Sequence, residues 1–271
     1  MSHEVWSFSR ANCYDDCPYN YKLAYKDKVD KSDNAFAEWG SLVHKCLELY
    51  FKGELDLFTI SDYYESHYDE YVKDRFPYDS RLNLSERYHE AGDIFLSDFQ
   101  GIDSDKYEVV GVEEYFKLDI NGVMLQGYID LVIKRKSDGA LIIVDHKSVS
   151  SLNGKKLKEY QRQLYLYSTH IKEKYGTFPS LLVFNLFREN KVNIATFNHE
   201  DYRESLSWFS QVVHDAQVDL DFTDKITAYH KLKNKDINTF KCNDFFCNNL
   251  CSVRAYCKRS ADYEGDDCDW L

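Results

Sequence analysis

The hydrophobic positions of the chain change their period near residue 101. Before that point, four apolar residues recur at the three- to four-residue spacing of one helix face: Trp39, Val43, Leu47 and Tyr50. The same spacing predicts further helices over 60–75 and 84–99. We therefore expect a helical N-terminal region.

Beyond residue 101 apolar and polar residues alternate, which is typical of strands. Such runs cover 107–120, 123–134 and 140–147. Asn121-Gly122 is a hairpin signal between the first two runs, and a second turn signal at 137–139 joins the next two. These residues predict a three-stranded antiparallel meander.

The remaining pattern predicts a helix over 155–174, strands over 181–187 and 192–197, and a helix over 201–218. Helices, hairpins, a crossover helix and further strands in this order predict an α/β core, a small mixed sheet flanked by helices. A cysteine-rich segment follows at the C-terminus.

No internal repeat or linker divides the chain, so we expect a single domain over 1–271. Within it we distinguish a helical part over 1–100, a core over 101–218 and a cysteine-rich part over 219–271. No apolar run is long enough to cross a bilayer, and residues 1–6 lack the basic start and apolar stretch of a secretory signal. These features predict a cytoplasmic protein without a membrane partner.

Charged side chains interrupt two of the predicted strands. Asp130 stands inside an apolar run, where an unpaired buried carboxylate costs several kcal/mol. In the next strand, alternation places Asp145 and Lys147 on one face and His146 on the other. Two carboxylates and an ammonium can therefore meet at the ends of adjacent strands.

Such a set suits phosphodiester hydrolysis. Asp130 and Asp145 offer hard oxygen ligands for Mg²⁺ or Mn²⁺, which polarise a phosphate and acidify a bound water. Lys147 can orient that water or stabilise the developing negative charge, and the backbone carbonyl of His146 would complete the coordination. A surface Asp-Lys pair at a strand end is the alternative interpretation.

Several short runs resemble the motifs of RecB-type exonucleases in the PD-(D/E)XK superfamily. In the core they are GYIDLV at 127–132, VDHKS at 144–148 and QLYLY at 163–167. Upstream, GSLVH at 40–44 resembles the family's Gly-x-x-x-His helix, while SFS at 7–9 and CPYNYKLAY at 17–25 resemble its opening. The runs keep the family's order.

The resemblance implies a restriction-endonuclease-like core and a metal-dependent DNA exonuclease acting on single-stranded DNA or DNA ends. It implies His44, Asp130 and Asp145 as metal ligands, which the His146 carbonyl named above would complete. Lys147 would be catalytic. Gln163 and Tyr167, which share a helix face four residues apart, would position the DNA strand or the lysine.

Three C-terminal cysteines resemble the terminal triplet of the iron-sulfur subset of this family, the CRISPR-associated and AddB-like members. The implied ligands of a [4Fe-4S] cluster are Cys17, Cys247, Cys251 and Cys257. Three residues rather than two separate the first pair of the triplet. Cys13 can replace Cys17, Cys242 can replace Cys247, and Zn²⁺ can replace the cluster; Cys46 and Cys268 are expected to be ordinary thiols.

The first strand of the meander carries Glu113 and Glu114, of which alternation lets only one face the cleft. We expect Glu114, because it shares its parity with Phe116.

A net charge of -12 speaks against DNA binding over the whole surface and leaves it to local basic groups. Those groups are Lys134 to Lys136, then Lys155, Lys156, Lys158 and Arg162, then Lys231, Lys233 and Lys235. The abundant aromatic residues can stack unpaired bases, which favours single strands or frayed ends.

The chain has no phosphate-loop motif of a helicase, so unwinding would need a helicase or another recombination or repair partner. The expected role is DNA recombination, repair or processing in a phage or prokaryote. The alternatives are a structure-selective endonuclease and a catalytically idle DNA-binding or adaptor protein with a zinc staple. Intact Asp130, Asp145 and Lys147 argue against idleness.

Overall fold

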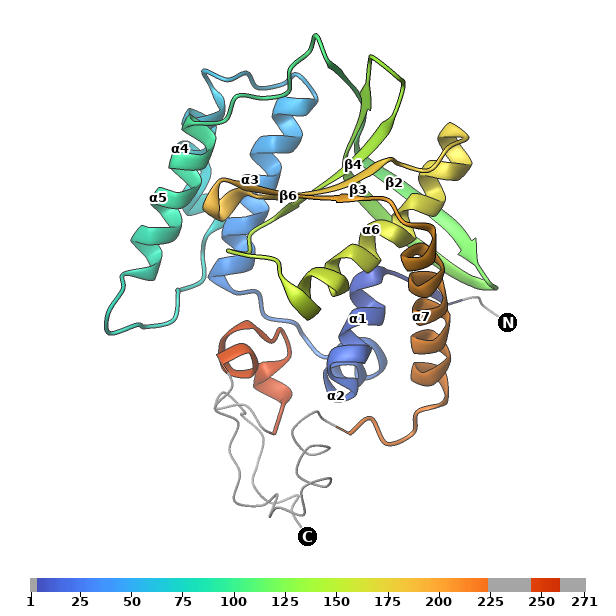
Figure 1. The fold of residues 1–271 in the computed structure, drawn as a ribbon. Coiled ribbons are helices and arrows are strands. Elements are labelled where there is room, and N and C mark those ends of the chain that lie inside the picture. The colour runs from blue at the N-terminus through green and yellow to red at the C-terminus, as the bar shows by residue number, and fades with distance from the viewer. Residues whose placement is uncertain (1–3, 224–244, 259–271) are drawn as a thin grey trace. The chain divides into compact units, whose positions relative to one another are not determined.

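The computed structural model of the chain describes residues 4–223 and 245–258 (Figure 1). The chain forms two compact units. The first comprises residues 1–8 and 35–210, and the second comprises 9–34 and 211–271. Five residues singled out above lie outside the described residues: Lys231, Lys233, Lys235, Cys242 and Cys268.

A six-stranded mixed sheet forms the centre of the first unit. Its strands are β1 (Val5–Trp6), β2 (Tyr107–Ile120), β3 (Val123–Arg135), β4 (Leu141–Lys147), β5 (Leu181–Leu186) and β6 (Lys191–Thr196). The order is β1-β3-β4-β5-β6, with β2 on β3. Antiparallel pairing of β2 with β3 and of β3 with β4 confirms the predicted meander. β4 and β5 are parallel, β5 and β6 antiparallel, and β1 runs parallel to β3.

Local chemistry fixes the two turns of the meander. Asn121 and Gly122 both have positive φ, 53° and 86°, as a two-residue hairpin turn requires. At the second turn the carboxylate of Asp138 accepts hydrogen bonds from the Arg135 guanidinium at 2.9 and 2.7 Å and from the backbone of Ala140 at 3.1 Å. Both turns set the register of the strands that carry the charged residues.

Helices cover the sheet of the first unit. They are α3 (Ala35–Phe51), α4 (Ile60–Tyr71), α5 (Leu84–Ser97), α6 (Gly154–Tyr175) and α7 (His199–Val218), whose residues from Gln211 onward belong to the second unit. Trp39, Val43 and Leu47 are fully buried, which confirms the predicted inner face of α3. The indole of Trp39 donates to the Tyr64 hydroxyl of α4 at 2.9 Å.

The helices α3 and α6 lie against opposite faces of the sheet. From α3, the ring of Phe51 stacks on His146 of β4 at 6.2 Å and packs on a cluster that includes Leu131. From α6, the ring of Tyr167 packs on Phe116 of β2 at 4.9 Å. The result confirms the predicted α/β fold, a mixed sheet flanked by helices.

In the second unit, segments from the two ends of the chain pack together. Its elements are α1 (Phe8–Asp16, from residue 9), α2 (Pro18–Tyr21), a π-helical turn (Lys22–Asp27) and the short turns Phe246–Leu250 and Arg254–Tyr256. The backbone N–H of Ser32 donates to the carbonyl of Ser252 at 2.8 Å. Leu23 and Ala24 form a small buried cluster with Cys251 and Val253.

None of the helices in 4–223 and 245–258 combines the length and the apolar character that crossing a membrane requires.

Candidate active site

A cavity of about 530 Å³ opens in the first unit where α3, β2, β3, β4 and α6 meet. Most of the predicted site residues line it: His44, Asp130, Asp145, His146, Lys147 and Gln163. Tyr167 does not line the cavity and instead touches Gln163 from behind. The structure thus gathers residues that are more than 100 positions apart in the sequence.

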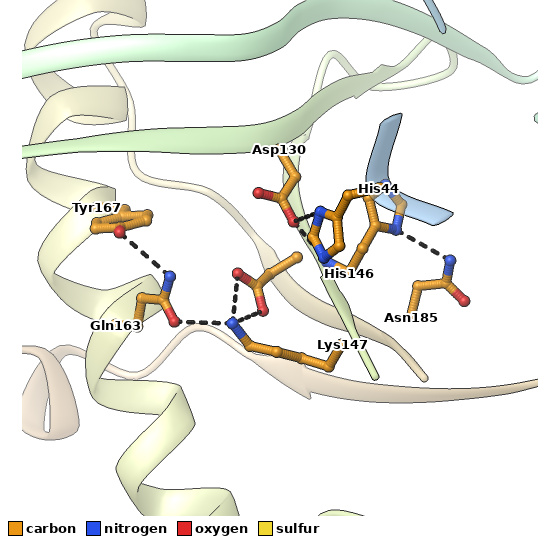
Figure 2. Close-up of polar contacts among 8 residues, drawn as sticks. His44, Asp130, His146, Lys147, Gln163, Tyr167 and Asn185 are labelled. Atoms are coloured by element: carbon orange, nitrogen blue, oxygen red, sulfur yellow. Dashed lines mark hydrogen bonds and ion pairs between the residues drawn. The ribbon is translucent and has the colours of Figure 1, made fainter. Parts of the chain in front are cut away.

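Lys147 and Asp145 form a buried ion pair at the end of β4. The ammonium lies 2.8 Å from Oδ2 of Asp145 and donates a hydrogen bond to Oδ1 at 3.1 Å. It also donates to Oε1 of Gln163 at 3.1 Å, and Nε2 of Gln163 donates to the Tyr167 hydroxyl at 3.2 Å (Figure 2). This chain of contacts fixes the position of the lysine head group.

Burial and charge act in opposite directions on this pair. Burial lowers the pKa of Lys147, but Asp145 and Asp130 raise it by more, so the net shift is upward and the side chain stays an ammonium. Burial raises the pKa of Asp145, against the effect of Lys147. Oδ2 of Asp145 is buried and, although it touches the ammonium, has no aligned hydrogen-bond donor. That oxygen is free to accept a second cation.

Beside the pair, His44, Glu113 and Asp130 bring their ligand atoms within 4.8 Å of one another. In the described part of the chain no other three His, Cys, Asp or Glu residues do so. Nδ1 of His44 lies 3.6 Å from Oδ2 of Asp130, which accepts the backbone N–H of His146 at 2.7 Å (Figure 2). Burial lowers the pKa of His44, which favours the neutral imidazole that binds metals.

Glu113, not Glu114, faces the cavity, so the sequence-based choice between them was wrong. Glu114 does share the side of Phe116, but that side is covered by α6, where Glu114 contacts His170 at 2.5 Å and Tyr175 at 2.9 Å. The error lies in assigning the cleft to that side.

A local break in the β2–β3 ladder brings Glu113 to the site. Glu113 has φ +47°, a left-handed conformation that is rare for residues other than glycine. The pairing passes from Val112 with Leu131 to Glu114 with Ile129 and omits Glu113 and Asp130. The available sequence signal was Gly111, since an isolated glycine in a strand pattern often marks a bulge, and the register of the two strands does shift between Val109 and Gly111.

The side chain of His146 points to the α3 side, as alternation predicts. Its Nδ1 lies 3.0 Å from Nδ2 of Asn185 (Figure 2), and its ring stacks on Phe51. Burial lowers its pKa to about 4. Its backbone is what reaches the group of His44, Glu113 and Asp130, through the N–H bound to Asp130 and through an interaction with His44.

Cys13, Cys17 and Cys251 of the second unit lie near one another. Burial, and then the neighbouring Cys17 and Cys251, raise the pKa of Cys13 to about 12. Cys251 and Cys257 contact the apolar cluster around Leu23. No three sulfur atoms among the described cysteines lie within 4.8 Å of one another.

The basic groups expected near the cleft are engaged in contacts of their own. Lys158 lies 2.9 Å from Glu204, and Arg162 stacks over the ring of Trp208 at 4.8 Å. Arg135 is held in the turn by Asp138, and Lys136 donates to the carbonyl of Ser104 at 2.8 Å.

Three comparisons with known proteins bear on this site. A family model described as the PD-(D/E)XK nuclease superfamily matches residues 5–258. Gene 69 protein of Mycobacterium phage D29 is 27% identical over 168 residues. The match covers 52% of this chain and 61% of the phage protein, less than two thirds of its length. A crystal structure of a candidate exonuclease from Eubacterium rectale aligns at 10% identity with a TM-score of 0.44, covering 79% of this chain and 82% of the other.

Proposed function

Because the chain belongs to the PD-(D/E)XK nuclease superfamily, we propose that it is a divalent-metal-dependent deoxyribonuclease that degrades DNA from its ends. One observation carries the proposal: the buried ion pair of Lys147 with Asp145 lies beside the group of His44, Glu113 and Asp130. An ammonium and a set of metal ligands around one cavity suit hydrolysis of a phosphodiester.

The donor set of the cavity fits Mg²⁺ or Mn²⁺. Glu113, Asp130 and the open oxygen of Asp145 supply the carboxylate oxygens that these ions prefer. His44 adds a neutral imidazole, and the carbonyl of His146 is our candidate for a further ligand. A divalent ion held there would polarise the phosphodiester and lower the pKa of the attacking water.

Lys147 supplies positive charge where the phosphate develops negative charge. Asp145 keeps the ammonium protonated, and Gln163 fixes its direction through the hydrogen bond at 3.1 Å. Tyr167 in turn holds the amide of Gln163. Gln163 and Tyr167 are therefore proposed as positioning residues for the lysine, and the ammonium acts as an electrostatic stabiliser rather than as a base.

The cysteines of the second unit are proposed to hold a [4Fe-4S] cluster through Cys17, Cys247, Cys251 and Cys257. Proximity of Cys13 to both Cys17 and Cys251 supports a site built from the two segments of the second unit. Cys13 stays an alternative to Cys17, and Zn²⁺ an alternative to the cluster. The site would join the two segments of the second unit, whose contacts include the Ser32–Ser252 hydrogen bond.

DNA recombination, repair or processing is the setting that we propose for this activity. The likeness to a phage protein supports a phage or prokaryotic role. A separate helicase would supply unwinding.

Cleavage of end-labelled linear and covalently closed circular DNA tests the proposal. We expect wild type to degrade linear DNA only, with Mg²⁺ or Mn²⁺, and Lys147→Ala to lose at least about a hundredfold in rate because the ammonium stabilises the transition state. Lys106→Ala is the matched control, since Lys106 also pairs with an aspartate but is exposed and lies outside the cavity.

Three results would contradict parts of the proposal. Cutting of the circle would make the protein an endonuclease. Cleavage by Lys147→Ala at the wild-type rate would contradict the role proposed for the lysine. If the folded, metal-loaded wild type cleaves neither substrate, the adaptor function is favoured.

A further inference from the structure

We propose that Tyr115 and Tyr128 form a stacking platform that holds the unpaired bases of the DNA strand beside the phosphodiester to be cleaved. This inference rests on the proposed nuclease function and adds how the site recognises a single strand. Tyr115 lies outside the motifs discussed above, Tyr128 is the second residue of GYIDLV but has been given no role there, and neither tyrosine lines the cavity itself.

The two rings form an exposed pair on the β2–β3 hairpin. Tyr115 and Tyr128 are directly opposite each other in the antiparallel register. Their ring centroids are 5.1 Å apart with an interplanar angle of 52°, and the Tyr115 hydroxyl donates to Oε1 of Gln126 at 3.3 Å. Both residues are nevertheless about half exposed, 50% and 56%. The pair therefore offers open aromatic surface held in a fixed orientation.

The platform lies next to the proposed metal ligands. Tyr115 is two residues from Glu113 and Tyr128 is two residues from Asp130, a step of about 7 Å along each strand. Their neighbour Phe116 faces α6, so by alternation the tyrosines lie on the other side of the ribbon. That is the side of the sheet against which α3, the helix of His44, packs.

The next cross-strand pair on the same face of the ribbon lies further from the proposed active site. Lys117 is opposite Gln126, and the lysine is exposed. Along the ribbon the order is thus a carboxylate pair for the metal and the cleaved phosphate, an aromatic pair for bases, and an ammonium for a further phosphate. Aromatic rings beside cationic groups are the usual means of binding single-stranded nucleic acid, and bases in a duplex have no free face to offer.

Rates on a single-stranded oligonucleotide and on the same chain with every base removed test the inference. Tyr115→Ala and Tyr128→Ala should each lower kcat/KM on the normal oligonucleotide about 5- to 150-fold, the range of one lost base stack. Tyr115→Phe keeps the ring and should stay close to wild type. Tyr78→Ala is the matched control, since Tyr78 is 92% exposed in the loop before α5 and should have no effect.

The abasic oligonucleotide separates stacking from a structural role of the pair in the hairpin. With no bases to stack, wild type and both alanine variants should cleave it at equal rates. Equal loss on both substrates, or no loss on either, would overturn the platform while leaving the nuclease intact. Failure of wild type to cleave any DNA would instead contradict the proposed function.

Discussion

At the scale of single residues, Glu113 is a side chain whose position destabilises the fold. Its left-handed backbone costs about 1–3 kcal/mol. Burial, and then the charge of Asp130, raise the pKa of its carboxyl to about 7. Within 4–223 and 245–258, Glu113 has no hydrogen bond or ion pair that offsets these costs, whereas Glu114 contacts His170 and Tyr175. A bound cation would relieve the repulsion.

Glu113→Gln and Glu114→Gln should therefore change the melting temperature in opposite directions. At pH 8 without metal, the first variant should melt at a higher temperature than wild type, because it removes a buried carboxylate that faces Asp130. It should also need at least about tenfold more Mg²⁺ for cleavage. The second should melt at a lower temperature, because His170, Lys174 and Tyr175 lose their shared partner, with little change in Mg²⁺ demand.

Melting curves with and without Mg²⁺, beside a Mg²⁺ titration of cleavage, measure both effects. A lower melting temperature for Glu113→Gln without metal would show that the Glu113 carboxylate does not destabilise the metal-free fold. An unchanged Mg²⁺ demand would show that Glu113 does not bind the metal.

At the scale of elements, periodicity predicted most of the sheet but not its irregularity. Alternation correctly placed Asp145 with Lys147 on one face, because β4 is regular up to its last residue. The same rule failed at Glu113, where one residue of each strand, Glu113 and Asp130, is omitted from the ladder and Glu113 has a left-handed backbone. The two-residue strand β1 is too short for any period to show. Positions of regular backbone can be read from a sequence, whereas a local break depends on contacts made by distant elements.

The C-terminal end of α7, in the second unit, gives a prediction about how the stability of the fold depends on pH. The carboxylate of Asp219, after α7, accepts the backbone N–H groups of Asp221 and Phe222, both at 3.0 Å, and the Tyr14 hydroxyl of α1 at 2.8 Å. Burial raises its pKa, but these three donors lower it by more. Its ionised form therefore stabilises the fold above its unfolded pKa of 3.8, and that contribution is lost as the pH falls through the lower folded-state pKa.

Asp219→Asn should lower the unfolding free energy by about 1 kcal/mol at pH 7, the scale of a partly exposed hydrogen-bonded charge. The difference from wild type should shrink as the pH falls below 3.8. Urea unfolding at a series of pH values measures it, with the helix-surface variant Asp215→Asn as control. If the difference in unfolding free energy between wild type and Asp219→Asn does not change with pH, the charge of Asp219 is not its cause.

At the scale of the whole molecule, the second unit joins segments that are more than 200 residues apart. Hydrogen bonds link Ser32 to Ser252 and Arg254 to the carbonyl of Asp33. Periodicity carries no information about such pairs, because neither segment has a long regular element. What pointed to their association was the resemblance of the cysteine spacing to a family with a shared cluster. The proximity of Cys17 and Cys251 to Cys13 is consistent with that interpretation.

The proposed cysteine site yields a prediction that separates ligands from ordinary thiols. Cys257→Ala should lose most of the iron and sulfide of the proposed cluster and lower the melting temperature, because such a site would contribute folding free energy to the unit. Cys46→Ala removes a fully buried thiol from the core of the first unit and should keep the full metal content.

Cys13→Ser and Cys17→Ser, compared by the same elemental analysis, identify the N-terminal ligand as the one whose loss empties the site. Zinc in place of iron in anaerobically purified wild type would select the alternative metal. Full metal content in Cys257→Ala would exclude that residue as a ligand.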